Sequence, residues 1–459
     1  MRNQINIKKR SAIYIISTFL LFGLSGFELA WAQENILTLD DALRMSVTRG
    51  SVQKQYEYAR DAAQQGIQVQ KADYLPTFQF RTSVSHANEA PRIPVEFKND
   101  TVLARQGTRN TFISRFELNQ VIYDFGKTRN NVSAARYQAQ SVDAEFDQKK
   151  FALRNEVRQQ FYNSLYYQNV DSIYDEVIPY SRELAQINEE RMKNGVALSP
   201  EVLKAQVDLQ QMEAQRASAE SGYRKALVQL AYLTGQEDTR FNTIGKLPDL
   251  PAQTDMSIYY NELYQRALRY RSDIDQLEFK SKQQEATAKS IEALKYPTLM
   301  LQSDFSYFGP DAFGYYSGLS SRGLNPVNWR VGVGFTYTIF DGSRIRSRKN
   351  QLLALKAQFQ EQANQLEQQI GTQIKTLLKD LENLRILEQN NKMLIEQIDA
   401  NIALVKASYD NGNVPRIEYI KAIIPRASAR AALQNTRSDI AQVLVELERA
   451  VGTDISDLW

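Results

Sequence analysis

The chain of 459 residues contains no cysteine and one histidine, and its formal charge is +3. The lack of cysteine excludes disulfides, thiolate metal sites and cysteine nucleophiles, and a single histidine argues against histidine-based acid–base or zinc chemistry. Of 56 basic and 53 acidic residues, four and one lie in the first 32 positions, so the remainder carries 52 of each sign. A neutral chain gives no support for binding nucleic-acid phosphates.

The first 32 residues have the layout of a cleavable signal peptide. The basic run Lys8–Arg10 precedes the apolar stretch 12–27, and Ala30–Ala32 is a small-x-small cleavage signal. The alternative is a membrane anchor, but the apolar run is short for a span and ends at a cleavage site. We therefore expect residues 1–32 to be removed and the protein to be exported. No later stretch is apolar over the roughly 18 residues that a membrane helix needs.

Two zones of alternating apolar and polar residues interrupt a largely helical pattern. The predicted strands are residues 77–87, 111–123, 298–308 and 328–340. Each run is about ten residues long and apolar on one face, which is typical of a transmembrane β-barrel strand. One face of a soluble sandwich also alternates, but that fold needs about seven strands. Long polar loops, about 86–110 and 309–328, are expected inside the two hairpins.

Four strands cannot close a barrel by themselves. An open sheet edge in lipid leaves N–H and C=O groups without partners, and the smallest useful barrel needs about eight strands. If these strands span a membrane, several chains must share one barrel, and three chains would supply twelve strands.

The rest of the pattern is dominated by two very long helices. Residues 127–193 and 345–409 repeat apolar side chains at spacings of three and four. Pro179 is the one expected kink in the first of them, and Asp124 and Asp341 are expected to cap the two helix starts. Sixty-odd residues span roughly 95 Å, so each helix must bury its apolar stripe against other long helices, as in a coiled coil.

The chain also contains a duplication. Asn-Gly occurs at Gly195 and again at Gly412, and both copies have Glu six residues later followed by Lys-Ala at a constant offset of 217. Each repeat runs helix, strand, loop, strand, long helix, Asn-Gly turn and returning helix. The predicted units are a first repeat at 33–240, a linker at 241–255 and a second repeat at 256–459. The two Asn-Gly turns therefore occupy equivalent tips, far from the strands.

This combination resembles the TolC-type outer-membrane efflux proteins. The resemblance rests on the duplicated unit, the two Asn-Gly turns and the ending Ala450–Thr453 after a helix, and it covers residues 37–452. It implies a mainly α protein with a β-barrel part. In that family a homotrimer forms a 12-stranded outer-membrane β-barrel, which a 12-helix α-barrel continues into the periplasm.

The resemblance also implies the function and its partners. The expected role is the exit channel of a tripartite efflux or type I secretion system, embedded in outer-membrane lipid and without a cofactor or catalytic residue. Substrate would come from an inner-membrane pump of the RND or ABC type through a periplasmic adaptor (membrane fusion protein). A structural periplasmic coiled-coil protein without a channel is the alternative. An enzyme is disfavoured because the sequence shows no clustered nucleophile, metal set or phosphate loop.

Site residues follow from the resemblance as well. The adaptor-docking tips would be Gly195, Val196, Ala197, Leu198 and Ser199 in the first repeat, and Gly412, Asn413, Val414, Pro415 and Arg416 in the second. Glycine at a helix end also fits a plain left-handed cap with no partner, so that alternative stays open.

The resemblance places a periplasmic gate at Glu201, Tyr409, Glu418 and Lys421. Glu201 and Tyr409 match family positions whose side chains link neighbouring coiled coils, and Glu418 matches an acidic ring at the entrance. Lys421 stands where the family has a second acid, and Val414 stands where it has an arginine. Because Glu418 and Lys421 are three residues apart on a helix, they can pair and leave the entrance nearly neutral.

Overall fold

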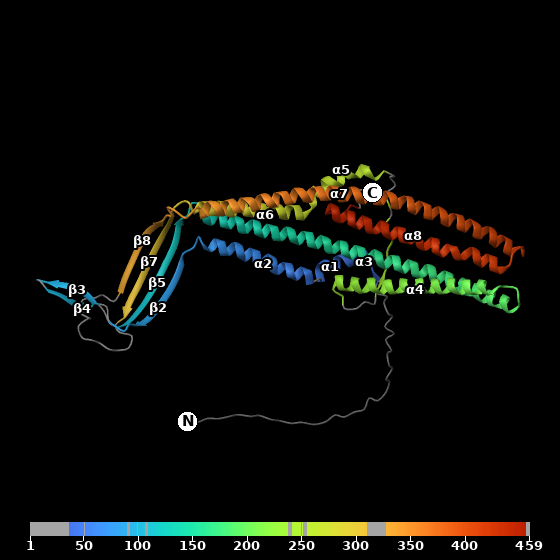
Figure 1. Ribbon diagram of the computed structural model, residues 1–459, viewed down its shortest axis with the longest axis horizontal. Coiled ribbons are helices and arrows are strands. Elements are labelled where there is room, and N and C mark those ends of the chain that lie inside the picture. Colours follow the sequence, from blue (N-terminus) through green and yellow to red (C-terminus); the bar gives the residue numbers. More distant parts are fainter. Residues whose placement is uncertain are drawn as a thin grey trace, which may run out of the picture.

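The computed structural model describes residues 36–49, 51–89, 92–98, 100–105, 109–236, 241–248, 250, 255–309 and 327–455. The predicted signal peptide, residues 1–32, lies outside this part. The described chain is long and narrow, with a β-sheet at one end and two helical tips at the other (Figure 1).

The helices are α1 Leu39–Arg49, α2 Ser51–Ala72, α3 Lys127–Lys193, α4 Ser199–Thr234, α5 Tyr260–Tyr270, α6 Ser272–Ala293, α7 Arg344–Asp410 and α8 Arg416–Val451, with a 3-10 turn at Met256–Tyr259. The strands are β1 Ile36–Leu37, β2 Thr77–His86, β3 Arg92–Phe97, β4 Asp100–Arg105, β5 Asn110–Tyr123, β6 Asn242–Thr243, β7 Thr298–Gly309 and β8 Val327–Thr336. The described part is therefore mainly helical.

The helices run along the long axis of the molecule and form one layer. Near the sheet, α3 packs between α2 and α6, and toward the tips it packs between α4 and α8. The other long helix, α7, packs on α6 and then on α8. Consequently α2 and α4 follow each other along one edge of the layer, and α7 forms the other edge (Figure 1).

Both long helices have 67 residues and span about 100 Å. Asp124 accepts hydrogen bonds from the backbone N–H groups of Gly126 and Thr128, at 3.0 and 2.7 Å. Asp341 accepts one from the N–H of Ile345 at 2.8 Å. The predicted caps are confirmed, and each aspartate satisfies donors that the first helical turn leaves free.

The sheet at the opposite end has the order β2-β5-β7-β8 with antiparallel neighbours, so β2 and β8 are its edges. One aromatic row crosses all four strands through the paired residues Phe80, Phe116, Phe305 and Trp329. These four side chains are between 46% and 72% exposed. The opposite face carries polar pairs such as Arg330–Asp304 at 2.9 Å. A sheet with an uncovered aromatic face cannot be the inner face of a soluble sandwich in this chain.

Two details of the predicted strands are wrong. The last strand ends at Thr336 rather than at residue 340, because its partner β7 begins at Thr298 and Pro297 before it has no N–H to continue the ladder. The loop predicted at 86–110 contains a second hairpin, in which Arg92–Phe97 pairs with Asp100–Arg105. Its composition resembles a polar loop, so the short strands were missed. Most of the loop predicted at 309–328 lies outside the described residues.

Two apolar clusters form a belt at mid-height. In the first repeat, α1, α3 and α4 bury residues around Phe161 and Leu230. In the second repeat, α5, α7 and α8 bury residues around Ile374 and Leu447. The predicted linker contributes β6, which pairs in parallel with β1 beside the first cluster. Each repeat therefore has its own core.

A buried ion cluster joins the two repeats at the belt. Arg158 on α3 pairs with Glu448 on α8 and, at 2.5 Å, with Asp454 beyond it. The side chains of Arg158 and Glu448 are 8% and 13% exposed. Burial raises the pKa of Glu448 to about 7, although the guanidinium of Arg158 acts in the opposite direction. Removing one member would leave a buried charge without a partner, so the cluster holds α8 in register with α3.

Candidate gate and docking tips

The two tips are built from the same backbone turn. Gly195 and Gly412 have φ of +72° and +75°, in the left-handed region that side chains other than glycine rarely adopt. At the first tip, the N–H of Val196 donates to the carbonyl of Arg191 at 2.8 Å, and at the second the N–H of Asn413 donates to that of Ser408 at 2.8 Å. A Cβ added at either glycine would meet nothing within 4 Å. Backbone conformation, not crowding within the chain, therefore requires glycine here.

The two tips present different surfaces. At the first, Val196 and Leu198 are 66% and 71% exposed, and Ala197 is buried. At the second, Asn413 and Pro415 are exposed, whereas Val414 and Arg416 are half-buried. Apolar surface available to a partner is therefore concentrated on the first tip.

Arg416 is the centre of a contact between the second tip and the first repeat. Its guanidinium donates two hydrogen bonds to the Glu183 carboxylate on α3, at 2.9 and 3.0 Å. It also lies 5.9 and 5.7 Å from the ring centroids of Tyr409 and Tyr419. The two rings stack, with centroids 5.7 Å apart and planes 7° apart. We call these four residues the tip clamp.

The tip clamp combines two interactions that strengthen a charge-assisted contact. A bidentate guanidinium–carboxylate pair is directional, and an aromatic face attracts the same cation. The hydrogen bond from Arg416 lowers the pKa of Glu183 below its ordinary value of 4.5. The carboxylate is therefore ionised at neutral pH.

The structure brings together only some of the predicted gate residues. Tyr409 belongs to the tip clamp, where its side chain contacts Tyr419 and Arg416 of the same chain rather than Glu201. Glu201 lies exposed in the first turn of α4. Glu418 and Lys421 form the predicted pair at 2.9 Å, and both side chains are about half exposed. A link from Glu201 to another chain stays a prediction.

Sequence reasoning missed Glu183 and Tyr419. Glu183 lies 233 residues before its partner, on a helix face where acids are common, so no local signal marks it. Tyr419 could have been noticed because it stands three residues after Arg416, on the same face of α8.

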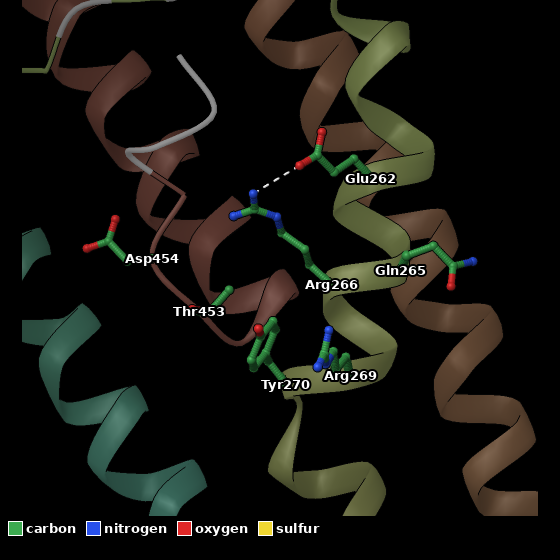
Figure 2. Close-up of a pocket in the computed structure, with 7 residues that line it drawn as sticks. All are labelled: Glu262, Gln265, Arg266, Arg269, Tyr270, Thr453 and Asp454. Carbon is green, nitrogen blue, oxygen red and sulfur yellow. Dashed lines mark hydrogen bonds and ion pairs between the residues drawn. The ribbon is translucent and has the colours of Figure 1, made fainter.

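One hollow of the described chain lies between α5 and the residues that follow α8 (Figure 2). It has a volume of about 630 Å³, and its lining residues are Glu262, Gln265, Arg266, Arg269, Tyr270, Thr453 and Asp454. Arg266 turns toward Glu262 and pairs with it at 2.9 Å. The hollow is open and mixed in charge, and it gives no catalytic arrangement.

Two other features are absent from the described residues. No group of three or more His, Asp or Glu side chains among them is placed to hold a metal ion. None of the helices in the described part is long and apolar enough to cross a membrane.

Comparison with known proteins agrees with this architecture. The sequence matches the outer membrane efflux protein family over residues 54–236 and 263–453. Nodulation protein T of Rhizobium leguminosarum bv. viciae is 21% identical over 353 residues, which are 75% of this chain and 70% of that protein.

Solved structures share the fold. The CmeC outer membrane channel of Campylobacter jejuni is 18% identical, with a TM-score of 0.71 over 90% of this chain and 85% of that one. The outer membrane protein VceC of Vibrio cholerae is 15% identical, with a TM-score of 0.70 over 90% of this chain and 96% of that one.

The chain belongs to the outer membrane efflux protein family, since the match covers most of its length. It is an outer-membrane efflux channel with a long periplasmic helical part. The alternative of a periplasmic coiled-coil protein without a channel is not favoured.

Proposed function

We propose that three copies of the chain form one channel, in which twelve strands close a barrel and the helical layers continue it as a periplasmic tunnel. The carrying observation is the four-stranded sheet, in which β2 and β8 each pair with one neighbour among the described strands. The aromatic row of the sheet can face lipid. The two edge strands cannot, because the N–H and C=O groups along an edge find no partner in a bilayer. Pairing β8 of one copy with β2 of the next removes every edge.

The helical layer supports the same arrangement. On the α2–α4 edge, Val207 and Tyr232 are 59% and 76% exposed, and on α7 Ile386 and Leu404 are 56% and 71% exposed. The two edges are different surfaces, so their contact is head-to-tail, and such contacts form a ring when the rotation closes. Three copies with four helical rows each give the twelve rows of the expected tunnel.

In this proposal the tips receive the partners. A periplasmic adaptor docks on the turns around Gly195 and Gly412, with Val196 and Leu198 as apolar anchors, and it connects the tunnel to an inner-membrane pump of the RND or ABC type. The family membership supports this assembly. Substrate passes through the tunnel passively, and the pump supplies the energy.

The gate is then the set of contacts that hold the tips together. The tip clamp ties the second hairpin to α3 of the first, and docking opens the tunnel by releasing it. Glu418 and Lys421 neutralise each other at 2.9 Å, so three copies give an entrance with little net charge. We propose weak ion selectivity there, with Glu201 available for contacts between copies.

The test is the mass of the mature protein extracted from outer membranes in mild detergent, by light scattering corrected for detergent. We expect three chains per particle, and stepwise conductance when those particles enter planar bilayers. A stable monomer from the same membranes would overturn the shared barrel, because four strands cannot close in lipid.

A further inference from the structure

Two prolines lie at the same height on neighbouring helices. The antiparallel helices α3 and α8 share one apolar cluster that includes Val177 and Ala427, and a second one nearer the tips that includes Leu184 and Ile420. Pro179 lies between the two clusters on α3. Pro425 lies between the same two clusters on α8, and both are interior to their helices.

The duplication does not account for this match. At the repeat offset of 217, the position equivalent to Pro179 is Glu396, and the position equivalent to Pro425 is Asp208. The two prolines therefore meet because α3 and α8 pack in this register. Both rings are exposed in the single chain, so neither proline is needed to fill a core.

Each proline weakens its helix at that level. Proline has no N–H, so the carbonyl of Asp175 loses its usual donor at Pro179, and that of Lys421 loses its donor at Pro425. An interior proline costs a helix about 3 kcal/mol and is among the usual causes of a kink. Two such points side by side define a plane in which both helices bend most easily.

The ion pairs at this level are also weak. Glu176 on α3 pairs with Arg430 at 2.6 Å and Arg426 at 3.6 Å, and Arg426 pairs with Asp399 on α7 at 2.7 Å. All four side chains are at least 37% exposed, so water and salt screen the pairs. A small crevice of about 20 Å³ is lined here by residues of α3 and α8.

We propose that Pro179 and Pro425 form a paired hinge, about which the last turns of the two helical hairpins tilt relative to the rest of the tunnel. The proposal rests on the proposed function, because docking at the tips provides the force. When the tip clamp is released, the ion pairs at the hinge open and the tips swing as one segment. The helices at the belt do not move, because the two apolar clusters and the ion cluster of Arg158 fix them to one another.

Because the chain contains no cysteine, spin labels can be attached to single cysteines introduced at chosen sites. One labelled pair crosses the hinge, Asn413→Cys with Gln265→Cys on α5. The matched pair, Ala432→Cys with Gln265→Cys, does not cross the hinge, because both sites lie on the belt side of it. Labelled chains are diluted with unlabelled chains so that pulsed dipolar spectroscopy reports distances within one chain, in any oligomeric state.

With Arg416→Ala added, so that the tip clamp is released, we expect a broad distance distribution for the pair that crosses the hinge and a narrow one for the pair between the hinge and the belt. When Pro179→Ala and Pro425→Ala are added to this variant, the restored hydrogen bonds should narrow the crossing distribution by about twofold and leave the distribution of the second pair unchanged. Pro200→Ala, at the start of α4 in the same tip, should change neither.

With Arg416→Ala present, a crossing distribution as narrow as that of the second pair would overturn the hinge, and so would a crossing distribution that both alanines leave unchanged. The alanine variants are expected to fold, because alanine favours a helix more than proline does. The failure of the proposed function is seen separately, since a monomeric mass contradicts the channel whereas these distances are measured within one chain.

Discussion

Arg416 shows how much one side chain can connect. It begins α8, reaches Glu183 on α3 and lies against the rings of Tyr409 and Tyr419. Its side chain is 41% exposed, and that of Glu183 is 37% exposed. An ion pair with this exposure is a weak contributor to folding, so the tip clamp suits a contact that has to open.

Arg416→Ala is therefore expected to affect gating more than stability. An exposed pair is worth about 0.2–1 kcal/mol, so spontaneous opening in planar bilayers should rise by at most about fivefold for each tip clamp that must open. Arg449→Ala is the matched control, because it removes an arginine of the same helix whose partner Glu446 lies within that helix and away from the tip. Equal effects of the two variants would contradict a special role for the tip clamp.

Acid should act on the same contact. The pKa of Glu183 is lowered from 4.5 in the folded protein, so its stabilising effect is present above pH 4.5 and is lost as pH falls from there through the folded pKa. Opening of the parent channel is expected to increase on acidification below pH 4.5. Glu183→Gln should already open more often at pH 7, and its response over the acidic range should be weaker.

At the scale of elements, α3 and α4 pack tightly against each other at Gly222. A Cβ there would overlap the ring of Tyr167 on α3. Two long helices can run this close only where one of them lacks a side chain, and the neighbouring ring fills the space.

Gly222→Ala is expected to destabilise the protein by about 1–3 kcal/mol, because the Tyr167 ring must leave its position. Gly66→Ala in α2 is the matched control, since nothing lies within 4 Å of a Cβ at Gly66. That change should stabilise the helix by about 0.5–1 kcal/mol. Thermal unfolding of both variants in the same detergent measures the difference, and a stabilised Gly222→Ala would refute the close approach.

At the scale of the whole molecule, the two faces of the sheet have different surroundings in the proposed channel. Val331, Val333 and Phe335 stand on one face of β8 and are 60%, 63% and 76% exposed. On the neighbouring strand Gln302, opposite Gly332, stands on the other face. The first face would contact lipid, and the second would line a lumen.

Val333→Arg should therefore reduce assembly into the outer membrane, because an arginine facing lipid near mid-depth costs about 2–4 kcal/mol. Gln302→Arg adds the same charge to the face toward the lumen and should assemble normally. The amount of each variant in purified outer membranes is the measurement. Loss of both variants to the same extent would contradict the assignment of the two faces.

Much of this architecture could be predicted from the sequence because it depends on local patterns. A spacing of three and four residues indicates a helix, alternation indicates a strand, and Asn-Gly indicates a turn with positive φ. Asp124 caps α3 within four residues of its own position. The duplication added the order of the elements, since both repeats use the same local signals.

Tertiary structure alone decided which distant residues meet. The packing of α3 against α8 is what brings Glu183 to Arg416. The same packing places Pro179 and Pro425 at the same level of the two helices. The end of β8 likewise depends on where β7 begins. The contacts between α3 and α8 join residues more than 200 positions apart, and their register comes from side-chain packing along whole helices, which local periodicity does not encode.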